Sequence, residues 1–383
     1  DVYKRQSDSE LKCTVTQGSY TIAGDTETGT TYTFSGTEKV VPMTASYQLT
    51  CEQAIAGMPA ELTVTDADGK PISRADIYQV SSDGSHKLGS TSMKGTFTKT
   101  FNTAGEYTFY AEKAGSGRSW NQHVIVCEKT TENDGKPFGI LTNGVTVPGT
   151  KSITWLTQIN GSAAEAQVKY STDDTLTDAA TVKGTSAIQT FVQSSRGDAL
   201  RSNKVTLTDL TPGTTYYYQV GDGTTWSDTQ SFKTPAANAE ATNFFILGDI
   251  QSSDTSNLAR VLDELKTSET AYDFALQTGD AIDDVTAYVK NWRPFLTTVN
   301  SDKLNGVDLI HVLGNHEYYG DADGKISKAI YDLPDSRMNS WYSMEYGNVC
   351  VVVVNHKNTG KNGGLVEATA QIAEQLKTDC AWK

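Results

Sequence analysis

The sequence predicts a multidomain protein in which two all-β modules precede an α/β domain. At 383 residues the chain is longer than one hydrophobic core usually serves, so two or three domains are expected. Up to about residue 234, short runs alternate apolar and polar residues between turn residues. From residue 244, apolar runs alternate with stretches of helical periodicity, which indicates strand-helix-strand units.

The first β module is predicted over residues 1–133. Period-two runs such as Glu61–Thr65, Ala75–Val80 and Gly105–Ala111 are separated by Gly and Asp turns. This pattern is typical of an antiparallel sandwich. The stretch from Glu61 to Cys127 resembles bacterial immunoglobulin-like (Ig-like) surface modules, a resemblance that carries no site. The polar segment 128–136 has no periodicity and is interpreted as a linker.

The second β module is predicted over residues 137–235. Its strands include Ser152–Thr157 and Thr215–Gly221, and Pro212-Gly213 predicts a tight corner before the second of these. With the closing Ser231–Thr234, these features resemble a fibronectin III-like sandwich, in the version that precedes the catalytic domain of purple acid phosphatases. Such domains pack against a neighbouring domain or present it, and they do not catalyse a reaction. We therefore assign no chemistry to this one.

The α/β domain is predicted over residues 241–383. Its expected strands alternate with helices, and each of the first three strands is a short apolar run. The expected elements, in order, are strand 244–248, helix 256–267, strand 273–278, helix 285–299, strand 308–313, helix 326–332, strands 340–346 and 349–355, and helix 367–378.

The first three of these strands each end in glycine followed by a side chain able to bind a metal. Asp249 and Asp280 are 31 residues apart, and Asp280 and Asn315 are 35 apart, spacings that fit strand-helix-strand units. Because the carboxyl ends of neighbouring parallel strands share one edge, these side chains are expected to converge, with His316 beside them. Oxygen donors with imidazole suit Mn, Fe, Zn or Mg, and paired ions of this kind clamp a phosphate. The pattern therefore predicts a phosphoester hydrolysis site.

The blocks Gly248-Asp249, Gly279-Asp280 and Gly314-Asn315-His316-Glu317 resemble those of calcineurin-like metallophosphoesterases, which have an α-β-β-α sandwich fold. With the fibronectin-like module in front, the chain is similar to purple acid phosphatases. The resemblance implies hydrolysis of phosphate monoesters with two divalent or trivalent metal ions (Fe, Mn or Zn). It implies that Asp249 binds the first metal, Asp280 bridges both and Asn315 binds the second. His316 would contact the phosphate and help to protonate the leaving group.

The chain departs from that family at several positions. Asp283 stands where purple relatives carry tyrosine, which puts a ferric ion in doubt, and Gln251 stands where the wider family often has histidine. The family's later histidine blocks have no counterpart before Lys383, and His356 is interpreted as a loop residue. We therefore expect a domain truncated at its C-terminus, with the remaining ligands beyond Lys383 and with residues 1–383 inactive alone.

Other interpretations stay open. The alternative for Asp249 and Asp280 is that they cap helices, although a repeat in register with Asn315 and His316 argues against this. His311, inside a strand, is expected in the core, and a solvated loop is favoured for Tyr318, Tyr319, Asp321 and Asp323. The closest functional variant is a phosphodiesterase. From another class, a secreted or cell-surface binding protein would retain a phosphoesterase fold without catalysis.

Charge and cysteines limit the partners and the compartment. A net charge of -14 argues against nucleic acid, and no apolar run is long enough to span a bilayer. We expect a small phosphoester substrate, an extracellular or cell-surface location, and cell-surface or glycan contacts through the β modules. Cys51 and Cys127 form a disulfide or stay unpaired, and Cys350 is expected to be a small buried hydrophobe.

Overall fold

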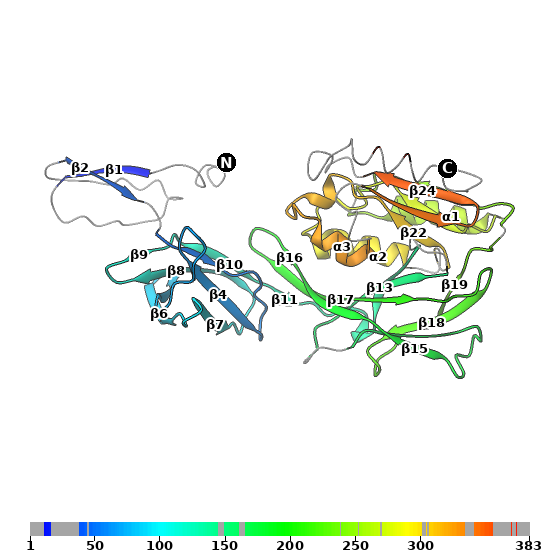
Figure 1. The fold of residues 1–383 in the computed structure, drawn as a ribbon, viewed down its shortest axis with the longest axis horizontal. Helices are drawn as coiled ribbons and strands as arrows, with labels where there is room; N and C mark the ends of the chain where they lie inside the picture. Colours follow the sequence, from blue (N-terminus) through cyan, green and yellow to red (C-terminus); the bar gives the residue numbers. More distant parts are fainter. Residues whose placement is uncertain are drawn as a thin grey trace. The chain divides into compact units, whose positions relative to one another are not determined.

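The computed structural model describes most of the chain between residues 46 and 354 (Figure 1). The described residues are 11–16, 38–43, 46–144, 149–160, 165–237, 239–251, 253–268, 270–300, 304, 306–333, 341–354, 369 and 373. They divide into two compact units. The first comprises residues 1–54, 59–100 and 107–124, and the second comprises 55–58, 101–106 and 125–383.

In the N-terminal β region, the pairs β1-β2, β3-β4, β4-β7, β5-β6, β5-β8 and β8-β9 are antiparallel. This region consists of the pair β1-β2, a three-stranded sheet in the order β3-β4-β7, and a sheet in the order β10-β8-β5-β6 with β9 beside β8. Alternation is visible in β4, where Leu62 and Val64 are fully buried. The strands are β1 (Leu11–Thr16), β2 (Glu38–Met43), β3 (Gln48–Thr50), β4 (Pro59–Thr65), β5 (Asp76–Ser81), β6 (Gly84–Ser90), β7 (Thr96–Thr100), β8 (Gly105–Lys113), β9 (Gly117–Arg118) and β10 (Gln122–Val126).

The second β region forms two sheets over one shared core. One sheet has the order β11-β17-β13-β12 with β16 beside β17, and the other has the order β15-β14-β18-β19. Ile153 and Trp155 of the first sheet pack with Tyr218 and Phe232 of the second. The strands are β11 (Glu128–Lys129), β12 (Phe138–Gly144), β13 (Lys151–Thr157), β14 (Gln167–Ser171), β15 (Ala180–Lys183), β16 (Thr185–Val192), β17 (Gly197–Leu207), β18 (Thr215–Gly221) and β19 (Gln230–Lys233), and a short 3-10 turn spans Asn133–Gly135.

The predicted corner before β18 is present. Gly213 has φ +67°, a left-handed conformation that glycine adopts without cost, and its N–H donates to Pro235 O at 3.0 Å. The Thr211 N–H donates to the Tyr216 hydroxyl at 2.9 Å. A tyrosine hydroxyl bonded to backbone a few residues upstream is the tyrosine corner of fibronectin-like and immunoglobulin-like sandwiches.

The α/β region is built on three parallel strands in the order β20-β21-β22. An antiparallel hairpin, β23-β24, follows them. The elements are β20 (Phe244–Leu247), α1 (Ser256–Thr267), β21 (Phe274–Gln277), a π-helical turn (Tyr288–Trp292), α2 (Arg293–Val299), β22 (Asp308–His311), a 3-10 turn (His316–Tyr318), α3 (Lys325–Tyr331), β23 (Trp341–Tyr346) and β24 (Val349–Val354).

Helix α1 has the predicted bounds, whereas the second helical segment begins later than predicted. It starts at Tyr288 rather than near Val285. The cause is local, because Asp284 Oδ1 accepts both the N–H and the hydroxyl of Thr286, which holds this stretch in a turn. The predicted helix 367–378 lies outside the described residues except at positions 369 and 373.

The strands β21 and β22 of the parallel sheet are covered on both faces. Ala275 and Leu309 pack in a cluster with α1, α2 and leucines of the second β region. Their neighbours Phe274 and Ile310 point the other way and pack against Tyr342, Met344 and Val353 of the β23-β24 hairpin. Burial on both faces explains why these strands are continuous apolar runs in the sequence.

The cysteines differ from the sequence-based expectation, because two thiols are free and Cys350 forms a disulfide. Cys51 and Cys127 are free, so the bridge considered between them does not form. Burial raises the pKa of the Cys127 thiol to about 12, which makes this group unreactive. Cys350 is disulfide-bonded, so the expectation that it is only a buried hydrophobe is wrong.

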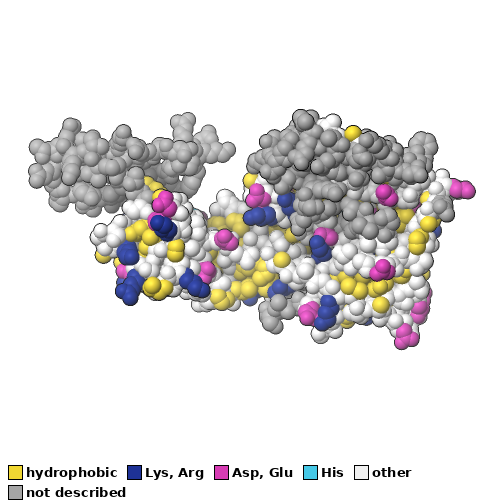
Figure 2. All heavy atoms as spheres, viewed as in Figure 1, with side chains coloured by type: hydrophobic (Ala, Val, Ile, Leu, Met, Phe, Trp, Pro, Cys, Tyr) yellow, Lys and Arg dark blue, Asp and Glu magenta, His cyan; other side chains and the backbone are white. Residues whose placement is uncertain are grey.

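The described surface carries no concentrated basic area on the face in Figure 2, where Lys and Arg side chains are scattered among Asp and Glu. Within the described residues, none of the helices is long and apolar enough to cross a membrane.

Candidate functional site

The three predicted site segments lie together at the carboxyl edge of the parallel sheet. Leu247 pairs with Gln277, and Gln277 pairs with His311, so the three strands end level with one another. The residues that follow each strand therefore emerge at one edge, as the sequence predicted.

The two predicted carboxylates converge on a single atom. Gln251 Nε2 donates to Asp249 Oδ1 at 2.5 Å and to Asp280 Oδ2 at 3.2 Å. The sequence showed only that Gln251 stands where the wider family often has histidine. In the structure its amide lies between the two carboxylates, which is where a shared cation would satisfy both.

Three residues at this edge have a strained backbone conformation. Asp249, Gln251 and Asp280 have φ of +52°, +35° and +51°, left-handed values that side chains with a Cβ rarely adopt. Each such residue costs on the order of 1–3 kcal/mol and persists only where the surroundings impose it. Strain of this kind is typical of functional sites.

Two glycines allow the loop after β21 to touch the loop after β22. A Cβ on Gly279 would lie 2.9 Å from both Cα and N of Gly314. A Cβ on Gly314 would lie 2.1 Å from Asp280 Oδ1. Gly279 and Gly314 are therefore required by the close approach of these two loops, which form one assembly.

Glu317 also connects these two loops. Its side chain is fully buried, and its carboxylate accepts the backbone N–H groups of Asp280 at 2.9 Å, Ala281 at 2.9 Å and Gly314 at 2.7 Å. Burial raises the pKa of Glu317, and these three N–H groups oppose the rise. The sequence analysis placed Glu317 in the block that begins at Gly314 but assigned it no role.

His316 is held in a defined orientation. The His316 backbone N–H donates to Asp280 Oδ1 at 2.8 Å, and the ring Nδ1 of His316 lies 2.6 Å from the Asp283 carbonyl oxygen. Because a carbonyl oxygen only accepts, Nδ1 carries the proton, and Nε2 is the nitrogen left for proton exchange. The Asp283 Oδ1 atom lies 3.6 Å from Nδ1.

Asn315 lies in the same loop at an exposed position. Its Nδ2 donates to the Tyr319 hydroxyl at 3.1 Å, and the Tyr319 ring packs 4.4 Å from the His316 ring, measured between centroids. Tyr319, for which a solvated loop was favoured, thus contacts both predicted site residues. The neighbouring Tyr318 is 5% exposed and packs in the core.

The remaining candidates have structural roles. His311 is buried and stacks on Tyr331, as expected of a core residue. Asp321 accepts the N–H of Ile326 at 2.7 Å in the first turn of α3. The capping alternative for Asp249 and Asp280 fails, because their side chains bond Gln251 and His316, and it is Asp254 that accepts an N–H at the start of α1.

The donor set suits hard cations. The carboxylates of Asp249 and Asp280, which both accept from Gln251 Nε2, are oxygen ligands of the kind that Mg, Mn and related ions prefer. In the part of the chain that the structure describes, no cluster of three or more His, Cys, Asp or Glu side chains could hold a metal ion.

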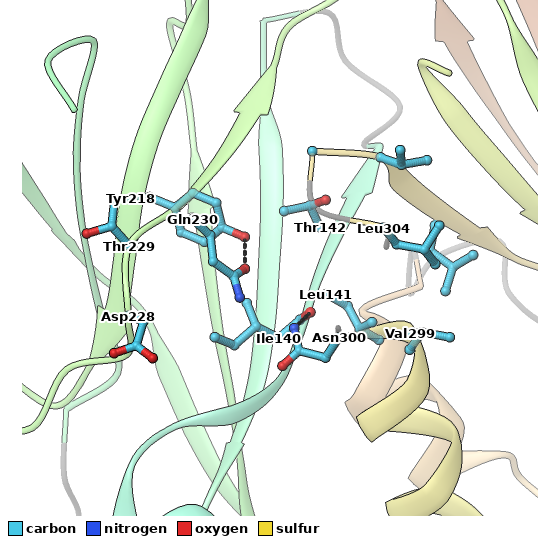
Figure 3. A pocket seen from close by; sticks show the side chains of 13 residues that line it. Ile140, Leu141, Thr142, Tyr218, Asp228, Thr229, Gln230, Val299, Asn300 and Leu304 are labelled. Carbon is cyan, nitrogen blue, oxygen red and sulfur yellow. Dashed lines mark hydrogen bonds between the residues drawn. The ribbon is translucent and has the colours of Figure 1, made fainter. Parts of the chain in front are cut away.

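A cavity of about 190 Å³ lies away from this site (Figure 3). Its lining includes Tyr218 and Gln230 of the second β region, and Leu304 and Val307, which precede β22. Tyr218 donates to Gln230 at 2.8 Å. Because Val307 precedes β22 and Asn315 follows it, the cavity lies near the opposite end of this strand and is not the candidate site.

Comparisons with known proteins agree with this geometry. Residues 137–234 match the family described as "Purple acid Phosphatase, N-terminal domain", and residues 242–375 match "Calcineurin-like phosphoesterase". The chain therefore carries a purple acid phosphatase N-terminal domain followed by a calcineurin-like phosphoesterase region, which confirms the resemblance inferred from the sequence blocks. A search of curated proteins found no match.

Solved structures also match the chain. Purple acid phosphatase from yellow lupin (Lupinus luteus) seeds matches with a TM-score of 0.50 at 15% identity, over 85% of this chain and 69% of the lupin chain. PhoD matches with a TM-score of 0.39 at 12% identity, over 60% of this chain and 54% of that chain. A two-domain fibronectin type III segment of chicken tenascin matches with a TM-score of 0.17 at 17% identity, over 49% and 98%. The lupin match supports the fold alone, and the other two carry no argument.

Proposed function

We propose that this protein is a metal-dependent hydrolase of phosphate monoesters, similar to acid phosphatases, with a dinuclear metal centre. One observation carries the proposal: the carboxylates of Asp249 and Asp280 converge on the Gln251 amide, in a loop assembly that also holds His316. The match of residues 242–375 to calcineurin-like phosphoesterases supports the same reaction class.

The proposed roles follow from the positions of the side chains. Asp249 and Asp280 would hold the metal ions, with Asp280 shared between them, and Asn315 would contribute its amide oxygen. Metal ions of this kind, when bound, supply the positive charge that clamps a phosphate and activates water. His316 would exchange a proton with the leaving group at Nε2, because Nδ1 is committed to Asp283 O.

A second candidate is a binding protein that keeps the phosphoesterase fold without catalysis. The Gln251 amide favours it, because its N–H groups satisfy both carboxylates without a cation. In this case the β regions would mediate cell-surface or glycan contacts. An extracellular location is proposed for either candidate, and the disulfide at Cys350 supports it, since disulfides persist in oxidising compartments.

The test measures hydrolysis of p-nitrophenyl phosphate and of bis-p-nitrophenyl phosphate after loading with Mn²⁺, Zn²⁺ or Fe²⁺. Metal-dependent turnover of the monoester supports the proposal, and preferential turnover of the diester supports the phosphodiesterase variant. Metal binding at Asp249 and Asp280 without turnover of either substrate, by a chain shown to contain the complete domain, favours the binding protein.

A further inference from the structure

The Asp280 loop and the Gly314–His316 loop share a single buried acceptor. Glu317 is fully buried, and its two oxygens accept three backbone N–H groups at 2.7 to 2.9 Å. Two of these groups belong to Asp280 and Ala281, and the third belongs to Gly314. A buried carboxylate is costly unless its oxygens are bonded, so this arrangement is a specific one.

The two loops belong to different strands and are distant in sequence. The bonds from Glu317 to Asp280 and Ala281 connect residues 37 and 36 positions apart. Gly279 and Gly314 remove the side chains that would separate the loops, but glycines only permit the approach. Glu317 supplies two of the hydrogen bonds that maintain the approach, beside the bond from the His316 backbone N–H to Asp280 Oδ1.

The same contact determines where the site residues lie. Asp280 is held at its N–H by Glu317 and at Oδ1 by the His316 N–H. Asp280 also has φ +51°, a conformation that its surroundings must impose. Releasing the Asp280 N–H would allow the loop to relax and would move the carboxylate away from its partners.

We propose that Glu317 is a positioning residue that fixes the Asp280 loop against the Gly314–His316 loop and so sets the distance between the metal-binding side chains. It acts through backbone N–H groups and does not itself touch metal or substrate. The proposal deepens the proposed function, since it concerns the same site, but its structural part can be tested without catalysis.

The substitution Glu317→Gln tests it with little change in size. Glutamine offers one acceptor oxygen and one NH₂ group where the carboxylate offers two oxygens, so at least one of the three N–H groups loses its partner. We expect faster hydrogen-deuterium exchange in peptides covering 278–282 and 313–317. We also expect Mn²⁺ affinity, measured by titration calorimetry on the same chain, to fall about 10- to 100-fold, the usual effect of losing an outer-shell partner.

Two controls separate positioning from general stability. Glu264→Gln changes an exposed glutamate of α1 and should alter neither exchange nor Mn²⁺ affinity. Leu262→Ala removes a fully buried side chain of α1 in the adjacent core, so it should lower the melting temperature while leaving Mn²⁺ affinity unchanged at temperatures where both chains are folded. An equal loss of affinity in Leu262→Ala and Glu317→Gln would show a merely structural role and overturn the proposal.

The outcomes also separate this inference from the proposed function. Unchanged loop exchange in Glu317→Gln would overturn the positioning role, whatever the activity. Selective loop exposure with weakened Mn²⁺ binding would support it, even if the unsubstituted protein hydrolysed no phosphoester and the proposed function failed.

Discussion

At the scale of single residues, Asp280 is bonded through its N–H and through both side-chain oxygens. Its N–H is bonded to Glu317, Oδ1 accepts from His316 and Oδ2 accepts from Gln251. In Asp280→Asn, one oxygen becomes an NH₂ group that faces other N–H donors. We expect turnover of p-nitrophenyl phosphate by the metal-loaded, complete domain to fall at least about 100-fold, the upper end of the range for outer-shell partners.

The matched control for this substitution is Asp68→Asn, an exposed position in the N-terminal β region. Its turnover should equal that of the unsubstituted protein. Circular dichroism should show folded β regions in both variants. Retention of more than a tenth of the turnover by Asp280→Asn would contradict the role of a shared ligand.

His311 makes stability depend on pH. Burial lowers its pKa well below the ordinary value, and neither ring nitrogen has a hydrogen-bond partner among the described residues. The ring packs against Tyr331 and Phe295, which carry no charge that would favour protonation. The folded chain keeps this ring neutral, whereas the unfolded chain takes up a proton as pH falls below about 6.5.

The free energy of unfolding should therefore fall as pH decreases from about 6.5, by up to about 1.4 kcal/mol per pH unit from this group. His311→Phe keeps an aromatic ring in the stack and should remove the contribution of His311 to the pH dependence of the free energy of unfolding. Urea unfolding at pH 7.5, 6.5 and 5.5 measures it. An unchanged slope in His311→Phe would refute the assignment.

At the scale of elements, the site depends on two loops that meet without side chains between them. In Gly314→Ala the added Cβ would lie 2.1 Å from Asp280 Oδ1 and 2.5 Å from Asp280 N, so one of the loops must move. We expect at least a tenfold loss of Mn²⁺ affinity by titration calorimetry, by analogy with the loss of an outer-shell partner.

Gly69→Ala is the control for backbone strain, because its φ is +78° and no atom lies within 4 Å of the added Cβ. It should cost about 1 kcal/mol of stability in the N-terminal β region and leave Mn²⁺ affinity unchanged. Metal binding by Gly314→Ala equal to that of Gly69→Ala would show that the two loops tolerate separation.

Sequence patterns predicted the repeated strand-helix units and their strand ends. They did not predict contacts between residues that are distant in the sequence. The strand ends carrying Asp249, Asp280 and Asn315 were predictable, because parallel strands end at one edge. The roles of Glu317 and Gln251 were not, because they depend on loop conformation and on partners up to 37 residues away. The start of the second helical segment was missed because the Asp284 turn competes with helix at Thr286.

At the scale of the whole molecule, the second β region and the α/β region share a buried ion pair. Lys151 of β13 pairs with Asp308 of β22, both side chains are at most 2% exposed, and Tyr346 donates to the same Asp308 oxygen at 2.9 Å. Thr154 of β13 also donates to Ile330 O at 2.7 Å. We therefore expect these regions to unfold together, in one transition.

Lys151→Met tests this coupling. It leaves Asp308 buried without its cation, so the free energy of unfolding should fall by about 3–5 kcal/mol in urea titration. Lys183→Met is the matched control, since its pair with Glu165 is exposed and should contribute at most about 1 kcal/mol. The double variant Lys151→Met with Asp308→Leu removes both charges and should recover most of the loss, because the penalty arises from the isolated charge. Two separate transitions in the unsubstituted protein, with only the first shifted by Lys151→Met, would show that the regions fold independently.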